Sequence, residues 1–373
     1  MQFIDLAKQQ SLIKESLDKR IQDVLAHGKY IMGPELKEME AQLAEYVGVK
    51  YCVSCSSGTD ALLMPLMAWD VGPGDAIFTT PFTFIATAEV IQLLGATPVF
   101  VDIDPKTYNI STELLDKAIQ AVIDAGELNP KAIIPVDLFG LPADYAAIEL
   151  IAKKYDIIVL EDAAQGFGGQ IDDRMACSFG DAAATSFFPA KPLGCYGDGG
   201  AIFTNDDELY EKLVSIRVHG KGGDKYDNIR IGLNGRMDTL QGAVILEKFT
   251  LFPNEVKLRN QVAATYNNLL QDRVVTPQVN AGYTSVWAQY SILAKDAEDR
   301  ALLQAALKDA GIPTAVYYPK SLHQQTAFSH LNYTDGDFPV SEEMSQRIFS
   351  LPMHPYLEKE DIEKICTVIN TID

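Results

Sequence analysis

Residues 186–200 read Ser-Phe-Phe-Pro-Ala-Lys-Pro-Leu-Gly-Cys-Tyr-Gly-Asp-Gly-Gly. The stretch starts at the end of one short β-like run, residues 182–188, and leads into another, residues 201–204. It places a single lysine, Lys191, in a tight turn of small residues. A desolvated pocket lowers the pKa of a lysine and frees its amine for Schiff-base chemistry, and glycines let the backbone approach a bulky ligand. An ordinary loop lysine is the alternative, and the residues upstream decide between the two.

Upstream of this turn, strand-like and helix-like runs alternate. The strand-like runs are 51–55, 76–80, 97–102, 131–136 and 157–160. The helix-like runs are 8–27, 35–46, 61–69, 85–94, 112–125 and 145–155. This alternation predicts an α/β fold whose large domain has a mostly parallel sheet flanked by helices. In such sheets ligands bind at the carboxyl ends of the strands, so the residues that follow each strand are the candidates for a site.

The length of the chain, 373 residues, predicts two domains. We expect an N-terminal segment and large domain over residues 1–245, and a smaller C-terminal α/β domain over residues 246–373. A long helical stretch after Gln241 leads from one to the other.

Charge and cysteine content exclude several classes of function. A net charge of −20 argues against a broad surface for nucleic acid or an anionic membrane. The start of the chain lacks a secretory signal, and no apolar run reaches transmembrane length, so we expect a cytoplasmic protein. Cys52 and Cys55 form a CxxC pair, but no second pair follows at zinc spacing, so no metal site is expected.

The first candidate site is Ser57-Gly58-Thr59, between a strand and a helix. Free N–H groups at a helix start bind anions such as phosphate, and Gly58 allows close approach. Simple capping of the helix by Ser57 or Thr59 is the alternative. No dinucleotide fingerprint follows a strand, which counts against a nicotinamide oxidoreductase, and no Walker sequence occurs.

The second and third candidate sites also follow strands. Asp162 stands at the mouth of an apolar strand, where a carboxylate needs a cation such as a protonated pyridine nitrogen, and Gln165 lies three residues on. The aromatic turn Pro81-Phe82-Thr83-Phe84-Ile85-Ala86-Thr87 follows another strand, and an aromatic face there can stack on a planar ring. The alternatives are a helix cap for Asp162 and a plain core role for the phenylalanines. Together with Ser186, five residues before Lys191, these residues form a set that is suited to binding pyridoxal 5′-phosphate (PLP).

On these residues the chain resembles the fold-type I PLP enzymes of the sugar-nucleotide aminotransferase family, the DegT–StrS type. The resemblance runs from Phe3-Ile4-Asp5-Leu6 to Leu351-Pro352-Met353-His354-Pro355. Residues 186–200 are most similar to 3-aminotransferases that act on UDP-2-acetamido-2-deoxy-3-oxo-glucuronate. The resemblance therefore implies amino transfer from L-glutamate to this keto-sugar nucleotide, for surface polysaccharide or O-antigen biosynthesis.

The resemblance also implies a role for each matched residue. Lys191 carries the cofactor and moves protons, Asp162 pairs with the ring nitrogen, and Gln165 contacts the ring hydroxyl. The phosphate is held by Gly58, Thr59 and Ser186, and Phe84 stacks on the ring. Asn234, from the motif Gly232-Leu233-Asn234-Gly235-Arg236, matches the asparagine that completes the neighbouring subunit's phosphate site. The resemblance thus implies a homodimer with composite active sites.

Substrate contacts are expected from Arg236, Tyr317, Tyr318 and His323. Arginine forms a planar fork that pairs with a carboxylate, although a structural role is the alternative for Arg236. Many relatives have histidine where this chain has Tyr317, which leaves that contact open. Lys191 argues against the related dehydratases, which have histidine at this position. The remaining alternatives are C3 or C4 amination of another UDP- or dTDP-keto-deoxysugar, and a non-catalytic PLP-binding regulatory protein.

Overall fold

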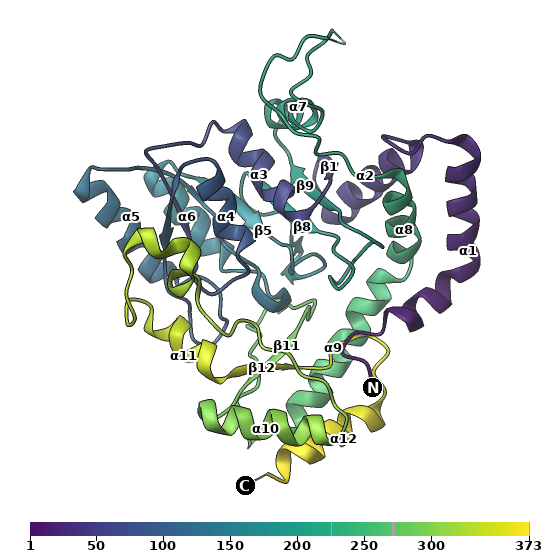
Figure 1. The fold of residues 1–373 in the computed structure, drawn as a ribbon, viewed down its shortest axis with the longest axis vertical. Helices are drawn as coiled ribbons and strands as arrows, with labels where there is room; N and C mark the ends of the chain where they lie inside the picture. Colours follow the sequence, from purple (N-terminus) through teal and green to yellow (C-terminus); the bar gives the residue numbers. More distant parts are fainter. Residues whose placement is uncertain (225, 271–272, 373) are drawn as a thin grey trace.

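A seven-stranded sheet forms the centre of the computed structural model, which describes residues 1–224, 226–270 and 273–372 (Figure 1). The strand order is β1-β9-β8-β5-β4-β2-β3. Only β9 runs antiparallel to its neighbours, so the predicted mostly parallel sheet is confirmed. The bounds are β1 Tyr51–Cys55, β2 Asp75–Thr79, β3 Thr97–Phe100, β4 Asn129–Ile133, β5 Ile158–Asp162, β8 Ala182–Ser186 and β9 Gly200–Thr204.

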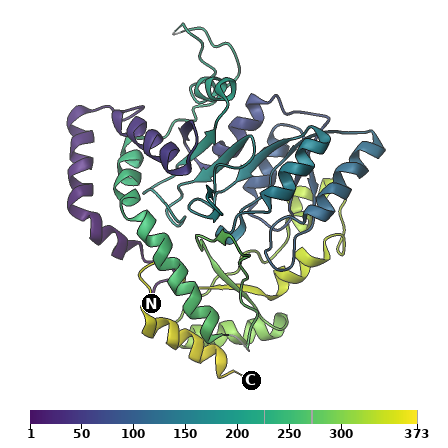
Figure 2. The same cartoon turned by 180° about the vertical axis from the view of Figure 1, so that it is seen from behind.

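Helices cover both faces of this sheet, as Figures 1 and 2 show from opposite sides. One face packs against α3 (Gly58–Ala68), α4 (Ala86–Leu93) and α7 (Asp207–Ile216). The other packs against α5 (Thr112–Ala125), α6 (Tyr145–Tyr155), α2 (Pro34–Val47) and α8 (Thr239–Phe249), with α1 (Leu6–His27) outermost. Strand side chains alternate between the two cores, since Ala182 and Ala184 face the first and Ala183 the second.

Helix ends follow local chemistry that the sequence displays. Asp5 caps α1 by accepting the N–H of Lys8 at 2.9 Å, and Gly28 ends that helix in the left-handed conformation with φ of 67°. The helical stretch after Gln241 is two helices rather than one, because α8 ends at Phe249 and α9 (Phe252–Leu269) begins with Pro253 in its first turn.

The C-terminal part has its own apolar core. α9, α10 (Ala297–Asp309) and α12 (Lys359–Asn370) pack around the antiparallel pair β11 (Tyr290–Leu293) and β12 (Ile348–Leu351). The remaining elements are β6 (Gln170–Ile171), β7 (Arg174–Met175), β10 (Tyr283–Thr284), α11 (Pro339–Arg347) and the 3-10 helices η1 (Leu138–Gly140), η2 (Leu322–Gln324) and η3 (Thr326–Leu331). The division into domains at residue 245 stays a prediction.

No helix in the described ranges is both long enough and apolar enough to cross a membrane. Nor do His, Cys, Asp and Glu side chains gather anywhere in those ranges into a group that could hold a metal ion.

Candidate active site

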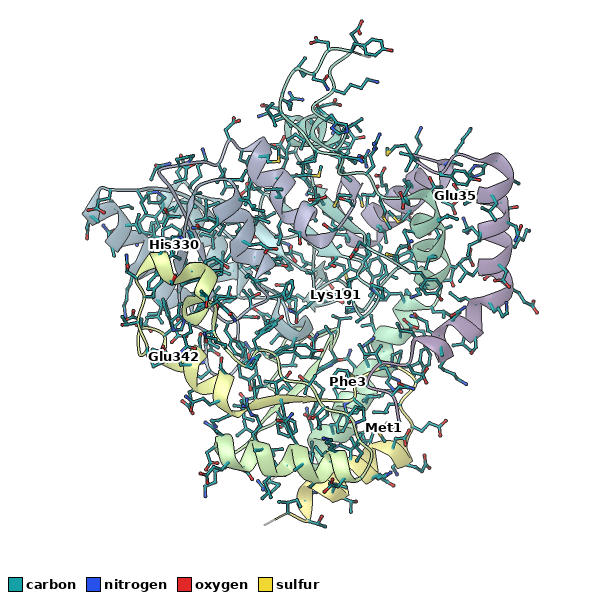
Figure 3. The ribbon with its side chains drawn as sticks, in the orientation of Figure 1. Met1, Phe3, Glu35, Lys191, His330 and Glu342 are labelled. Carbon is teal, nitrogen blue, oxygen red and sulfur yellow. The ribbon has the colours of Figure 1, made fainter. Side chains whose placement is uncertain are left out.

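Lys191 stands on the loop between β8 and β9, near the middle of the molecule (Figure 3). Two backbone hydrogen bonds of 2.8 Å fold this loop back on itself: Lys191 donates to Phe188, and Cys195 donates to Phe187. Gly194 permits the turn, because a Cβ there would lie 2.6 Å from the carbonyl oxygen of Phe188. The folded loop and its small residues therefore hold Lys191 at the end of the sheet.

Asp162, the last residue of β5, is buried and interacts electrostatically with Lys191. Its Oδ2 accepts a hydrogen bond of 2.8 Å from Oγ1 of Thr87, and its Oδ1 accepts one of 3.2 Å from the N–H of Ala164. Burial raises the pKa of Asp162, against the effect of these bonds and of the Lys191 charge. Burial also lowers the pKa of Lys191, against the effect of Asp162. A second cation beside Asp162 would relieve the cost of burying its carboxylate, and a protonated ring nitrogen is such a cation.

Gln165 follows Asp162 by three residues, and both the oxygen and the nitrogen of its side-chain amide are hydrogen-bonded. Its Oε1 accepts the N–H of Phe139 at 2.9 Å, and its Nε2 donates to the hydroxyl of Tyr318 at 3.2 Å. The ring of Tyr318 packs edge-on against Phe82, at 6.1 Å between centroids. Two of the predicted site residues, Gln165 and Tyr318, are thus brought together from distant parts of the chain.

The start of α3 meets the end of β8. Ser57 caps α3 by accepting the N–H of Asp60 at 3.1 Å, so the cap is Ser57 rather than Thr59. A Cβ on Gly58 would lie 2.6 Å from Cβ of Ser186, so only glycine allows this approach. Gly58 and Ser186 therefore flank one helix start, and Thr59 follows in its first turn, where free N–H groups favour a phosphate.

Phe84 is 55% exposed, which excludes the alternative of plain core. It lies in the turn between β2 and α4, and the first turn of α4 carries Thr87, the partner of Asp162. Sequence reasoning missed Thr87. A threonine hydroxyl can donate a hydrogen bond to a buried carboxylate, which could have drawn Thr87 into the site. The local sequence does not show which carboxylate it reaches.

Tyr317 and His323 differ in their freedom to contact a substrate. Tyr317 is partly buried beside Tyr318. His323 is buried, with its Nε2 3.0 Å from Oε1 of Glu342 and its ring 4.7 Å from that of Phe338. The geometry gives His323 a structural partner, and its substrate contact stays a prediction.

Asn234 and Arg236 interact with each other. Nε of Arg236 donates to Oδ1 of Asn234 at 2.8 Å, and the carbonyl of the intervening Gly235 accepts the N–H of Ser56 at 3.0 Å. This motif therefore lies against the chain just before the Ser57–Gly58 turn. Neither terminal nitrogen of the Arg236 guanidinium hydrogen-bonds to another described residue, so both can reach a carboxylate.

The residues present fit PLP. A buried carboxylate suits the ring nitrogen of this cofactor, and the amide of Gln165 suits its hydroxyl. An exposed aromatic ring suits its ring face, and a helix start next to a serine suits its phosphate. Lys191 is the amine to which the cofactor's aldehyde would attach.

Comparison with known proteins agrees with this geometry. The model of the DegT/DnrJ/EryC1/StrS aminotransferase family matches residues 11–370. The UDP-2-acetamido-2-deoxy-3-oxo-D-glucuronate aminotransferase of Pseudomonas aeruginosa is 49% identical over 99% of both chains. A pleiotropic regulatory protein of Geobacillus stearothermophilus is 42% identical over 97% of both chains.

Solved structures extend the likeness to the fold. A DegT DnrJ EryC1 StrS aminotransferase from Brucella abortus is 53% identical, with a TM-score of 0.96 over 99% of this chain and 98% of that one. NtdA from Bacillus subtilis, solved with bound cofactor PMP, is 31% identical, with a TM-score of 0.87 over 96% of this chain and 82% of that one. Similarity over the whole length, together with the cofactor-binding geometry, leads to one conclusion: the chain belongs to the DegT/DnrJ/EryC1/StrS aminotransferase family and is a PLP-dependent sugar aminotransferase.

Proposed function

We propose that this enzyme moves an amino group from L-glutamate to C3 of UDP-2-acetamido-2-deoxy-3-oxo-glucuronate, in the biosynthesis of surface polysaccharide or O-antigen. The observation that carries the proposal is the Lys191–Asp162 pair, in a chain 49% identical throughout to an aminotransferase named for this sugar. The five cysteines are free and buried, which fits work in the reducing cytoplasm, where we place it.

Each of the candidate residues would hold a different part of the cofactor. Asp162 would hold a positive charge at the ring nitrogen, with Thr87 and the N–H of Ala164 fixing its two oxygens. Gln165 and Tyr318 would orient the ring hydroxyl. Gly58, Thr59 and Ser186 would hold the phosphate. When bound there, PLP supplies the electron sink for amino transfer between a donor and a keto sugar.

Lys191 would then move protons. Its amine has a pKa lowered by burial, so more of it is neutral near pH 7 and able to accept a proton than for an exposed lysine. A single lysine on a folded loop can take a proton from one carbon and return it to another, as both half-reactions require.

Arg236 is proposed to bind the carboxylate of the uronate. A bidentate, charge-assisted contact is worth roughly 1.5–3 kcal/mol, so Arg236→Ala should lower kcat/KM for the uronate about ten- to a hundredfold. The same change should have little effect on the counterpart with an uncharged 6-hydroxymethyl group. Steady-state kinetics with the two sugars provide the measurement.

Arg236→Lys is the matched variant, because lysine keeps the charge but lacks the fork, and it should restore only part of the loss. Equal losses on both sugars would show that Arg236 serves the fold or the phosphate site instead. Because Arg236 donates a hydrogen bond to Asn234, the Asn234→Ala variant should be assayed with the same two sugars, to separate the loss of this bond from the loss of a substrate contact.

We propose that the enzyme is a homodimer in which Asn234 reaches the phosphate site of the neighbouring subunit. The loop between α7 and Asn234 projects from the body of the molecule (Figure 1). It carries Ile229, 56% exposed, and Ile231, 85% exposed. Large apolar side chains on a projecting loop are typical of a surface that another subunit covers.

Mixing two inactive variants tests this arrangement. Lys191→Ala and Asn234→Ala chains, combined in equal amounts and allowed to exchange, should recover about a quarter of the wild-type activity. Half of the dimers are then mixed, and each mixed dimer has one intact site. Residual activity of each homodimer is the background. Mixed dimers that form but gain no activity would place Asn234 in its own subunit's site or outside any site.

The relative named a pleiotropic regulatory protein favours a second candidate, a PLP-binding regulator without turnover. Such a protein would bind the cofactor but would not change its visible spectrum when glutamate is added. A regulator could use Lys191, Asp162 and Gln165 to bind the cofactor as the enzyme would, so the spectral response to glutamate distinguishes the two.

A further inference from the structure

Two carboxylic acids outside the family's site residues lie buried behind Asp162. Asp137 follows β4, Glu161 is the fourth residue of β5, and both are fully buried. In the described part of the chain, no lysine or arginine forms an ion pair with either of them. Two neighbouring ionised carboxylates without a cation would repel each other strongly in such a place.

The hydrogen bonds that the described residues make around these acids leave one oxygen of Asp137 without a donor, and a proton shared with Glu161 could fill that position. Oδ1 of Asp137 accepts the N–H of Ala143 at 3.0 Å and the hydroxyl of Tyr145 at 2.8 Å. Within the described residues, no N–H or O–H of another group reaches its Oδ2. The side chains of Asp137 and Glu161 interact electrostatically, and two carboxyl groups can hydrogen-bond to each other only if one of them is protonated.

Glu161 is fixed on its other side. Its oxygens accept the N–H of Cys177 at 2.6 Å and that of Phe179 at 2.9 Å. The ring of Phe179 stacks on Tyr145 at 4.4 Å, with 3° between the planes. Since Tyr145 donates to Asp137 and the backbone N–H of Phe179 donates to Glu161, the stacked rings of Tyr145 and Phe179 connect the two acids.

The pair adjoins the cofactor residues. The N–H of Asp137 donates to the carbonyl of Asp162 at 3.0 Å, and Glu161 is the residue before Asp162. A Cβ on Gly166, which follows Gln165, would lie 2.9 Å from Cγ of Asp137, so this turn rests directly on the acid. We propose that Asp137 and Glu161 share one proton, and that this acid pair positions Asp162 and Gln165 from behind.

This pair makes stability depend on pH with a defined sign. Burial raises the pKa of Asp137, and burial followed by the charge of Asp137 raises that of Glu161. The folded protein therefore keeps a proton at neutral pH that the unfolded chain releases, so stability falls as pH rises. For one proton the unfolding equilibrium constant increases by at most about tenfold per pH unit.

Other titratable or charged groups face the pair: Tyr145, Asp162, the Cys177 thiol, Tyr283 and, over the Phe179 ring, Arg174. Burial raises the pKa of the Tyr145 hydroxyl and of the Cys177 thiol far above neutrality, so neither accounts for a change near pH 7.

Asp137→Asn is the sharpest test. Its amide oxygen can accept from Ala143 and Tyr145, and its NH₂ can donate to an ionised Glu161, so it replaces the shared proton without loss of a bond. Urea unfolding of the cofactor-free protein from about pH 6 to about pH 9 gives the profile. The stability of the wild type should fall more steeply with pH than that of Asp137→Asn. If stability falls equally with pH in the wild type and in Asp137→Asn, the proposal that the two acids share a proton is wrong.

Positioning is tested by cofactor binding, read from the visible spectrum and the dissociation constant of PLP. Asp137→Ala leaves a buried hydroxyl and N–H unpaired and should weaken binding by about tenfold or more, whereas Asp137→Asn should bind nearly as the wild type does. Wild-type binding by Asp137→Ala would overturn the positioning role. If that variant does not fold, a wild-type spectrum and affinity in Asp137→Asn support the role, and an altered spectrum or affinity overturns it.

The proposal concerns the cofactor site and is independent of the sugar. Neither readout uses a sugar nucleotide, so an error in the proposed substrate would leave both results unchanged.

Discussion

Replacing Lys191 with alanine is expected to lower the rate of amino transfer by at least about a thousandfold, because general acid–base catalysis alone contributes roughly 10²–10⁴-fold. The fold should survive, since the bond that Lys191 makes to Phe188 uses the backbone N–H. Circular dichroism and single-turnover kinetics with glutamate measure the two effects.

A matched control is Lys154→Ala, which removes an exposed lysine on α6 that pairs with Asp116. This variant should transfer amino groups at the wild-type rate. Borohydride reduction followed by peptide mapping should place the cofactor on Lys191 in the wild type. A label on another lysine would contradict the assignment, as would substantial turnover in Lys191→Ala.

Asp162→Asn is expected to lower kcat by about 10²–10³-fold, the usual effect of removing one preorganised electrostatic partner. The change is mild for the fold. The amide oxygen can accept from Ala164, and its NH₂ can donate to Thr87, whose hydroxyl turns toward Thr83 at 3.1 Å. What is lost is the negative charge that would hold a proton on the ring nitrogen.

Asp181→Asn serves as its control. Asp181 precedes β8, at the opposite end of the sheet from the site, and accepts the N–H of Val159 at 2.8 Å. This variant should be less stable but keep its kcat. If Asp162→Asn turns over as fast as Asp181→Asn, the ring nitrogen has another partner and the Asp162 assignment is wrong.

The sequence was a good guide to the large sheet because its strands are apolar and its helices carry clear end signals. Helices 112–125 and 145–155 have the predicted bounds. The strand predicted to end at Leu160 continues to Asp162, because Glu161 and Asp162 pair with Ala183 and Ala184 of β8. Two charged residues in a buried strand violate the hydrophobic pattern, and their partners lie far away in the chain.

The same limit applies to the site. Strand ends indicated Asp162, Gln165 and Lys191 as candidates, since a parallel sheet gathers those ends at one edge, and their roles stay predictions. Thr87 and the Asp137–Glu161 pair were not predicted, because their roles depend on contacts between segments 16 to 75 residues apart. Tyr318 was expected at the substrate, yet its hydroxyl bonds Gln165, and only the folded chain shows this.

The most direct test of the proposed function is amino transfer from L-glutamate to a small panel of UDP- and dTDP-keto-sugars, with the position of the new amine read by NMR. The panel includes UDP-2-acetamido-2-deoxy-3-oxo-glucuronate, its 6-hydroxymethyl counterpart and a C4-keto deoxysugar. We predict the highest kcat/KM for the uronate and a product that carries its amine at C3. Preference for another sugar, or amination at C4, would contradict the proposed substrate.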